Sequence, residues 1–133
     1  MKTHDVQSIS IAKPRSEVFA YIANPANLPE WTNAFKSADA ERAELVTPNG
    51  AVPIQLETRA SAEHGTIDWI MTFPDGSIGA AYSRVTEDAG DSSIYSFVLM
   101  APPVPLEALE GALEEQKKTL ATELVSLRKR LEA

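Results

Sequence analysis

The stretch SISIAKPRSEVFAYIANPANLPEW, residues 8–31, predicts how the fold begins. Isoleucines alternate with serines around Ile9, which is the period of a β-strand. Pro14 suits the first turn of a helix, and the residue before Pro25 avoids helical angles, so we expect a first short helix between these prolines. A second short helix is expected over residues 27–35, where apolar side chains follow helical spacing. Both helices are too short to be stable alone, so they must pack against a sheet.

The central part of the sequence, residues 37–100, changes to the two-residue period of β-strands, with turn residues at short intervals. Strands are expected over residues 41–46, 52–57, 67–73, 78–85 and 93–100. The first of these has the weakest pattern. Short links between successive strands indicate an antiparallel meander, because parallel neighbours need long crossover connections. Together with the N-terminal strand, this pattern predicts a curved antiparallel sheet of about six to seven strands.

The last segment, LEALEGALEEQKKTLATELVSLRKRLEA at residues 106–133, predicts one long helix. Its leucines follow one helical face at positions 106, 109, 113, 120, 124, 127 and 131. Acidic residues are concentrated early and basic residues late, which matches the helix dipole. Such a helix is roughly 40 Å long at 1.5 Å per residue, so it can cross a whole sheet.

Composition limits the class of protein. The 133 residues, 44% hydrophobic and 23% charged, predict a single globular domain over residues 1–133. A formal net charge of −7 argues against binding to nucleic acid or to an anionic membrane, because both need a basic face. The absence of cysteine excludes disulfides and thiolate metal sites. We find no apolar run long enough for a membrane span and no signal peptide, so a cytoplasmic protein is expected.

The order of the expected elements and three short motifs resemble the SRPBCC superfamily. The motifs are AKP at residues 12–14, VF at 18–19, and NPANLPEW at 24–31. The resemblance covers essentially the full length and is strongest to small stand-alone members related to polyketide cyclases and dehydrases and to START-type domains. It implies an α+β helix-grip fold, in which the curved sheet wraps around the long C-terminal helix. Members of such a superfamily share a pocket but no single reaction.

The resemblance implies an apolar pocket between the sheet and the C-terminal helix. We expect it to bind a small hydrophobic or aromatic ligand, and the alternative is a polyketide cyclase/dehydratase-type enzyme that uses the same pocket. The candidate lining residues are Trp31, Phe35, Trp69, Met71, Phe73, Tyr82, Tyr95, Phe97 and Leu113. Aromatic residues at strand spacing also serve as ordinary core, and in this architecture core and pocket lining are the same residues.

Four polar residues are candidates for acid–base or anchoring roles, each with a plainer interpretation. His64 lies beside Glu63 but in a turn, where histidines usually face solvent. Asp68 is an ordinary solvated carboxylate if its strand face is the outer one, and a general base with a raised pKa if that face is the inner one. Arg84 shares its strand face with Tyr82, so both are expected to point inward, where Arg84 could hold a ligand carboxylate or phenolate.

Cofactors and macromolecular partners are not expected. An oxygenase-type iron site needs two histidines and a carboxylate, and the only histidines, His4 and His64, lie near the terminus and in a turn. The expected partner is therefore a small hydrophobic ligand, with no metal and no cofactor. The sequence leaves open a monomer or a homodimer. A third possibility is a protein-interaction role for the sheet edge or the leucine-rich helix.

Overall fold

The computed structural model describes residues 3–47, 50–101 and 106–133, including side chains except at residues 47 and 106–112. Its elements follow in the order β1 (His4–Ile11), α1 (Arg15–Ala23), the 3-10 turn η1 (Pro25–Asn27), α2 (Leu28–Trp31), β2 (Phe35–Ala38), β3 (Arg42–Thr47), β4 (Gly50–Ser61), β5 (Thr66–Thr72), β6 (Ile78–Asp88), β7 (Ser92–Met100) and α3 (Leu106–Glu132).

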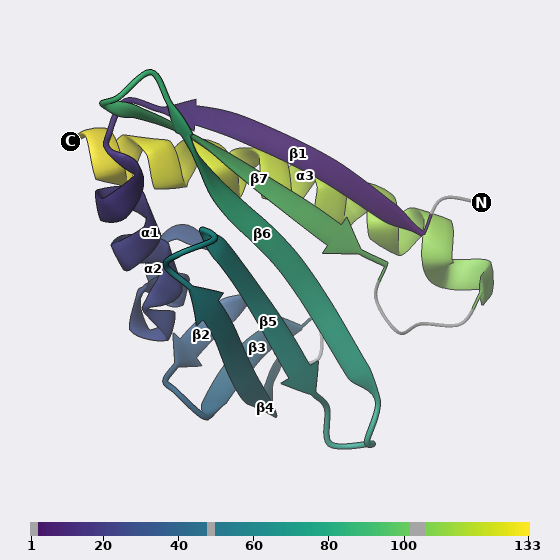
Figure 1. Ribbon diagram of the computed structural model, residues 1–133. Helices are drawn as coiled ribbons and strands as arrows, with labels where there is room; N and C mark the ends of the chain where they lie inside the picture. Colours follow the sequence, from purple (N-terminus) through teal and green to yellow (C-terminus); the bar gives the residue numbers. More distant parts are fainter. Residues whose placement is uncertain (1–2, 48–49, 102–105) are drawn as a thin grey trace.

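The seven strands form one antiparallel sheet in the order β1-β7-β6-β5-β4-β3-β2. Strands β2 to β7 are a meander of hairpins, and β1 joins it beside the last strand, β7. The sheet curls, and α3 runs along β1 and β7 while α1 and α2 cover the other end (Figure 1). The expected helix-grip fold, with two short helices after the first strand, is therefore confirmed.

Two hydrogen bonds attach the β1 region of the chain to α3, one from the middle of β1 and one from the residue just after it. The Gln7 amide donates to the main-chain carbonyl of Lys117 at 3.0 Å. At the far end, the main-chain N–H of Ala12 donates to the Glu132 carboxylate at 2.8 Å. These contacts join residues more than a hundred positions apart and hold the helix parallel to the strand that precedes α1.

Helix α1 begins and ends at the two predicted prolines. The Pro14 carbonyl accepts hydrogen bonds from the N–H groups of Glu17 and Val18 in the first turn. At the other end Asn24 has extended angles before Pro25, and its side-chain oxygen accepts from the N–H of Ala26. The prolines thus set both boundaries of the helix as expected.

The second helix is shorter than the expected 27–35. Helix α2 ends at Trp31, because Thr32 is extended and its hydroxyl donates to the Leu28 carbonyl at 2.7 Å. Phe35 instead opens the edge strand β2, which pairs with β3. The expectation of a helix through Phe35 is wrong, since a four-residue edge strand leaves too short a pattern to identify in the sequence.

The inward face of β6 is the opposite of the one expected. Ser83 and Val85 are buried, whereas Tyr82 is 41% exposed and Arg84 is exposed. The register explains the orientation, because Ala81 lies opposite the buried Trp69. The expected inward orientation of Tyr82 and Arg84 is therefore wrong. In this strand the small side chains face the core, and the largest ones face solvent.

The leucine face of α3 lies against the inner side of the sheet. Leu113, Leu120, Leu124 and Leu127 are at most 3% exposed, and burial stabilises each by about 1.5–3 kcal/mol. The expected leucines at positions 106 and 109 lie outside the residues whose side chains are described. In the described ranges, we find no helix with the length and apolar character that crossing a membrane requires.

Candidate functional site

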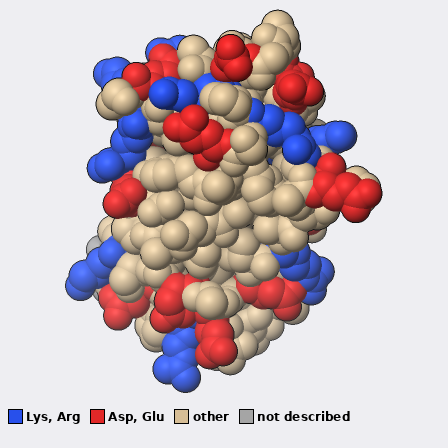
Figure 2. Space-filling model, turned by 60° about the vertical axis from the view of Figure 1, so that its left-hand side comes forward, with Lys and Arg blue, Asp and Glu red and all other residues tan. Residues whose placement is uncertain are grey.

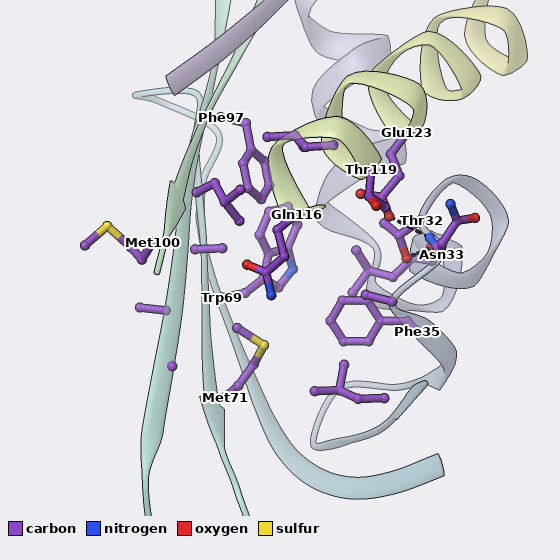
Figure 3. A pocket seen from close by; sticks show the side chains of 18 of the residues that line it. Thr32, Asn33, Phe35, Trp69, Met71, Phe97, Met100, Gln116, Thr119 and Glu123 are labelled. Atoms are coloured by element: carbon purple, nitrogen blue, oxygen red, sulfur yellow. Dashed lines mark hydrogen bonds between the residues drawn. The ribbon is translucent and has the colours of Figure 1, made fainter. Parts of the chain in front are cut away.

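A cavity of about 400 Å³ lies between the inner face of the sheet and the helices α2 and α3 (Figure 3). Six of the expected lining residues surround it: Trp31, Phe35, Trp69, Met71, Phe73 and Phe97. Figure 3 shows Phe35 facing the side chains of Trp69 and Met71 across the open volume. Residues from α2, β2, β5 and β7, far apart in the sequence, therefore meet at one site.

The other three expected lining residues lie elsewhere. Tyr95 is fully buried on the inner face but is not part of the cavity wall. Leu113 is buried on α3, also outside the lining, and Tyr82 is on the outer face of the sheet. Tyr95 and Leu113 therefore have core positions near the cavity.

Four aromatic rings form a continuous row, the aromatic wall, of which Trp31, Trp69 and Phe97 line the cavity and Tyr95 is buried outside the lining. Trp31 meets Tyr95 edge to face with ring centroids 6.3 Å apart, and Tyr95 meets Phe97 at 6.4 Å. Phe97 then stacks on Trp69 at 6.1 Å. These separations are typical of favourable aromatic pairs, which stabilise a structure beyond their buried area. The wall therefore has a fixed shape against which a flat ligand could pack.

Small residues of β6 make room for the cavity. Gly79 and Ala81 are part of its lining, together with Ala80 between them. A Cβ atom added at Gly79 would lie 3.2 Å from the Phe73 ring, so the glycine lets that ring lie close to the strand. This segment was not among the expected lining residues, although three consecutive small residues in a strand signal empty space or a close approach.

Glu123 is the ionisable residue of the lining, and sequence reasoning missed it as well. It projects from α3 beside Leu124, and its carboxylate accepts a hydrogen bond from the main-chain N–H of Asn33 at 2.6 Å (Figure 3). Burial raises the pKa of Glu123, and hydrogen bonds from the N–H groups of Asn33 and Ala34 oppose this shift. The side chain thereby connects α3 to the segment between α2 and β2.

The four polar candidates are not part of the cavity wall. His64 is exposed in the turn between β4 and β5. Asp68 is half-buried on the outer face, where it pairs with Tyr82 across the strands, and Arg84 is exposed on the same face. The structure therefore brings none of these four described residues to the apolar volume.

Apart from Glu123, the described lining of the cavity carries no charged side chain, and part of the protein surface is uncharged as well (Figure 2). No lysine, arginine or histidine occurs among the described lining residues, and the described chain contains no cluster of potential metal ligands. Figure 2 shows a face on which charges of both signs gather toward the two ends, with a broad uncharged band between them. The exposed lining residues Val46 and Gln116 mark where the cavity meets solvent.

Comparisons with known proteins identify the fold. No family model and no curated protein sequence matches this chain. Among solved structures, XoxI from Bacillus cereus has a TM-score of 0.72 at 15% identity, with 98% of this chain and 96% of that chain covered. A START superfamily protein from Mycobacterium smegmatis has a TM-score of 0.71 at 14% identity, covering 98% of both chains.

An enzyme is also among the structural neighbours. The Zhui aromatase/cyclase from a Streptomyces species has a TM-score of 0.64 at 9% identity, with 96% of this chain and 90% of that chain covered. Similarity at such low identity defines the fold and not the activity. The chain therefore has the SRPBCC-like fold that START and aromatase/cyclase proteins share.

Proposed function

We propose that this protein binds a small hydrophobic or aromatic molecule in the cavity between the sheet and α3. The observation that carries this proposal is the cavity itself, about 400 Å³ in volume and lined mainly by aromatic and aliphatic side chains. Protein interiors are normally close-packed, and ligand pockets start at about 300 Å³. An engineered apolar cavity of about 150 Å³ holds one benzene molecule, so this one has room for about two or three fused rings.

Binding is better supported than catalysis. A cyclase or dehydratase that uses acid–base chemistry needs titratable groups directed at one volume. The described lining supplies one such group, Glu123, with a raised pKa. Glu123 is the observation in favour of the cyclase/dehydratase-type alternative, and the aromatase/cyclase neighbour agrees with it. His64, Asp68 and Arg84 lie outside the cavity and do not add to this alternative.

Intrinsic fluorescence provides a direct test, because both tryptophans of the chain line the cavity. A panel of fused-ring hydrocarbons and ketones should change tryptophan emission saturably and raise the melting temperature. An Ala81→Phe variant places a ring in the cavity and should weaken binding by tenfold or more, because the ring occupies ligand space. Ala51→Phe adds the same ring at an exposed position of β4 outside the lining, and should leave affinity unchanged.

If folded Ala81→Phe binds as well as the unmodified protein, the ligand lies somewhere other than this cavity. A saturable signal accompanied by turnover of a polyketide-like substrate, lost in Glu123→Gln, would support the enzymatic alternative instead.

A further inference from the structure

Two hydrogen-bond donors in the cavity wall have no partner. Trp31 and Trp69 are each 3% exposed, and the indole Nε1 of each is buried without a hydrogen bond in the described part of the chain. An indole N–H can only donate. Buried polar groups are nearly always paired, so two unpaired donors indicate that an acceptor is missing in this conformation. The hydroxyls of Tyr95 and Thr58 are buried and unpaired as well.

The two indoles belong to the same aromatic wall. Trp31 and Trp69 are linked through the rings of Tyr95 and Phe97, each neighbouring pair about 6 Å apart. Figure 3 shows the Trp69 side chain projecting from β5 toward the space in front of α3. A flat ligand lying on this wall would therefore contact the Trp69 ring.

The charge of the lining restricts what such a ligand can be. The described lining contains no cationic side chain, and its one carboxylate, on Glu123, already accepts from Asn33. A ligand carboxylate or phosphate would be desolvated beside Glu123 without a counter-charge, which is strongly unfavourable. A neutral acceptor oxygen avoids this penalty and can still pair with an indole N–H.

We propose that the ligand is a neutral, flat, hydrophobic molecule whose carbonyl oxygen accepts a hydrogen bond from Trp69 Nε1. This inference rests on the proposed binding function. The nitrogen of Trp69 has no contact with solvent, so an incoming carbonyl reaches it by displacing neighbouring side chains. Met71 and Gln116, which are unbranched and line the cavity, have the rotamer freedom for such a displacement.

A matched pair of probes tests this inference. Fluorenone and fluorene share one three-ring skeleton, and fluorenone has a carbonyl where fluorene has a methylene. In wild-type protein fluorenone should bind about three- to tenfold more tightly, as one additional hydrogen bond predicts. A carboxylate derivative of fluorene should bind less tightly than either. Calorimetry gives the three affinities without depending on tryptophan emission.

The atoms themselves are observable by NMR. With two tryptophans in the chain, isotope-labelled protein gives two indole N–H signals, which Trp69→Phe and Trp31→Phe assign. Fluorenone should move the Trp69 signal downfield, and fluorene should not. In Trp69→Phe, which keeps an aromatic ring but has no N–H, both probes lose the contacts of the indole equally, so the ratio of the fluorenone and fluorene affinities should fall to about one.

The outcomes separate this inference from the function on which it rests. Equal binding of both probes with an unmoved Trp69 signal would overturn the ketone assignment and leave the binding function standing. That result would point to an internal acceptor, for which Thr58, opposite Trp69 on β4 with its own unpaired hydroxyl, is placed. Failure of every probe to bind would overturn the proposed function and this inference together.

Discussion

Gly65 occupies a turn between β4 and β5 that a larger residue does not fit. Its φ is +74°, and an added Cβ would overlap the carbonyl oxygen of Val85. The guanidinium of Arg15 fills the same corner and donates to the carbonyls of Ala62 and Glu63 at 2.8 and 3.2 Å. This corner therefore connects the β4–β5 hairpin to α1.

We expect Gly65→Ala to lower the free energy of unfolding by about 3 kcal/mol, because it adds steric overlap to an unfavourable backbone conformation. Gly76→Ala is the matched control, since Gly76 also has a positive φ but nothing lies near its added Cβ. Gly76→Ala should lower the free energy of unfolding by only about 1 kcal/mol. Urea denaturation of both variants measures the difference, and equal losses would contradict the packing described for this corner.

Glu123 makes stability depend on pH. Burial raises its folded-state pKa above the ordinary value of 4.5. Its contribution to stability is therefore fully present below pH 4.5 and is lost as pH rises through the raised folded-state value. Glu123→Gln keeps an acceptor for the Asn33 N–H and cannot ionise.

The free energy of unfolding of Glu123→Gln should therefore rise relative to wild type as the pH increases through this window. Urea denaturation over a pH series measures the difference between the two proteins. Lys117 and Glu114, an exposed ion pair on the same helix, supply a comparison: Glu114→Gln should show a much smaller dependence. A relative stability of Glu123→Gln that falls with pH would mean that the carboxylate is stabilised by folding.

The sequence predicted the part of the cavity lining in which the side chains are large and alternate along a strand. Trp69, Met71 and Phe73 follow strand period, and the structure places all three at the cavity. The small residues that create its volume were not predicted, because a cavity is defined by atoms that are missing. Glu123 was not predicted either, since an acid on an amphipathic helix is usually solvated.

At the scale of elements, periodicity predicted the long and regular segments. The leucine pattern of α3 and the alternation of β5 and β7 led to correct assignments. Strand β2 was missed because four residues carry too little pattern. The orientation of β6 was reversed because Ser83 is buried, with its hydroxyl donating to the Ile67 carbonyl at 2.7 Å. A polar residue satisfied by the neighbouring strand has no signature in a hydropathy pattern.

Because α3 packs against the sheet with one face, shortening its side chains should destabilise the protein to different extents. Leu127 is fully buried, whereas Val125 is 36% exposed on the same turns. We expect Leu127→Ala to lower the free energy of unfolding by about 3 kcal/mol, through lost burial and the cavity left behind. Val125→Ala should change it by less than about 0.5 kcal/mol. Comparable losses at the two positions, measured by urea denaturation, would place α3 in a different rotation.

At the scale of the whole molecule, one arrangement explains both the packed core and the cavity. One end of the curled sheet is filled by the leucines of α3 and the residues of α1. Toward β2 and the small segment of β6, the helix and the sheet do not fill the space between them, and aromatic side chains surround what remains. The prediction of a monomer or a homodimer remains a prediction.

The most direct test of the central claim is native mass spectrometry of the purified protein, followed by denaturation and identification of any released molecule. We expect a bound hydrophobic species that leaves on denaturation and is reduced in Ala81→Phe but retained in Ala51→Phe. A neutral ketone among the released species would also agree with the role assigned to Trp69. Protein that carries nothing, and that gains no thermal stability from a panel of hydrophobic ligands, would contradict the claim that this cavity is a binding site.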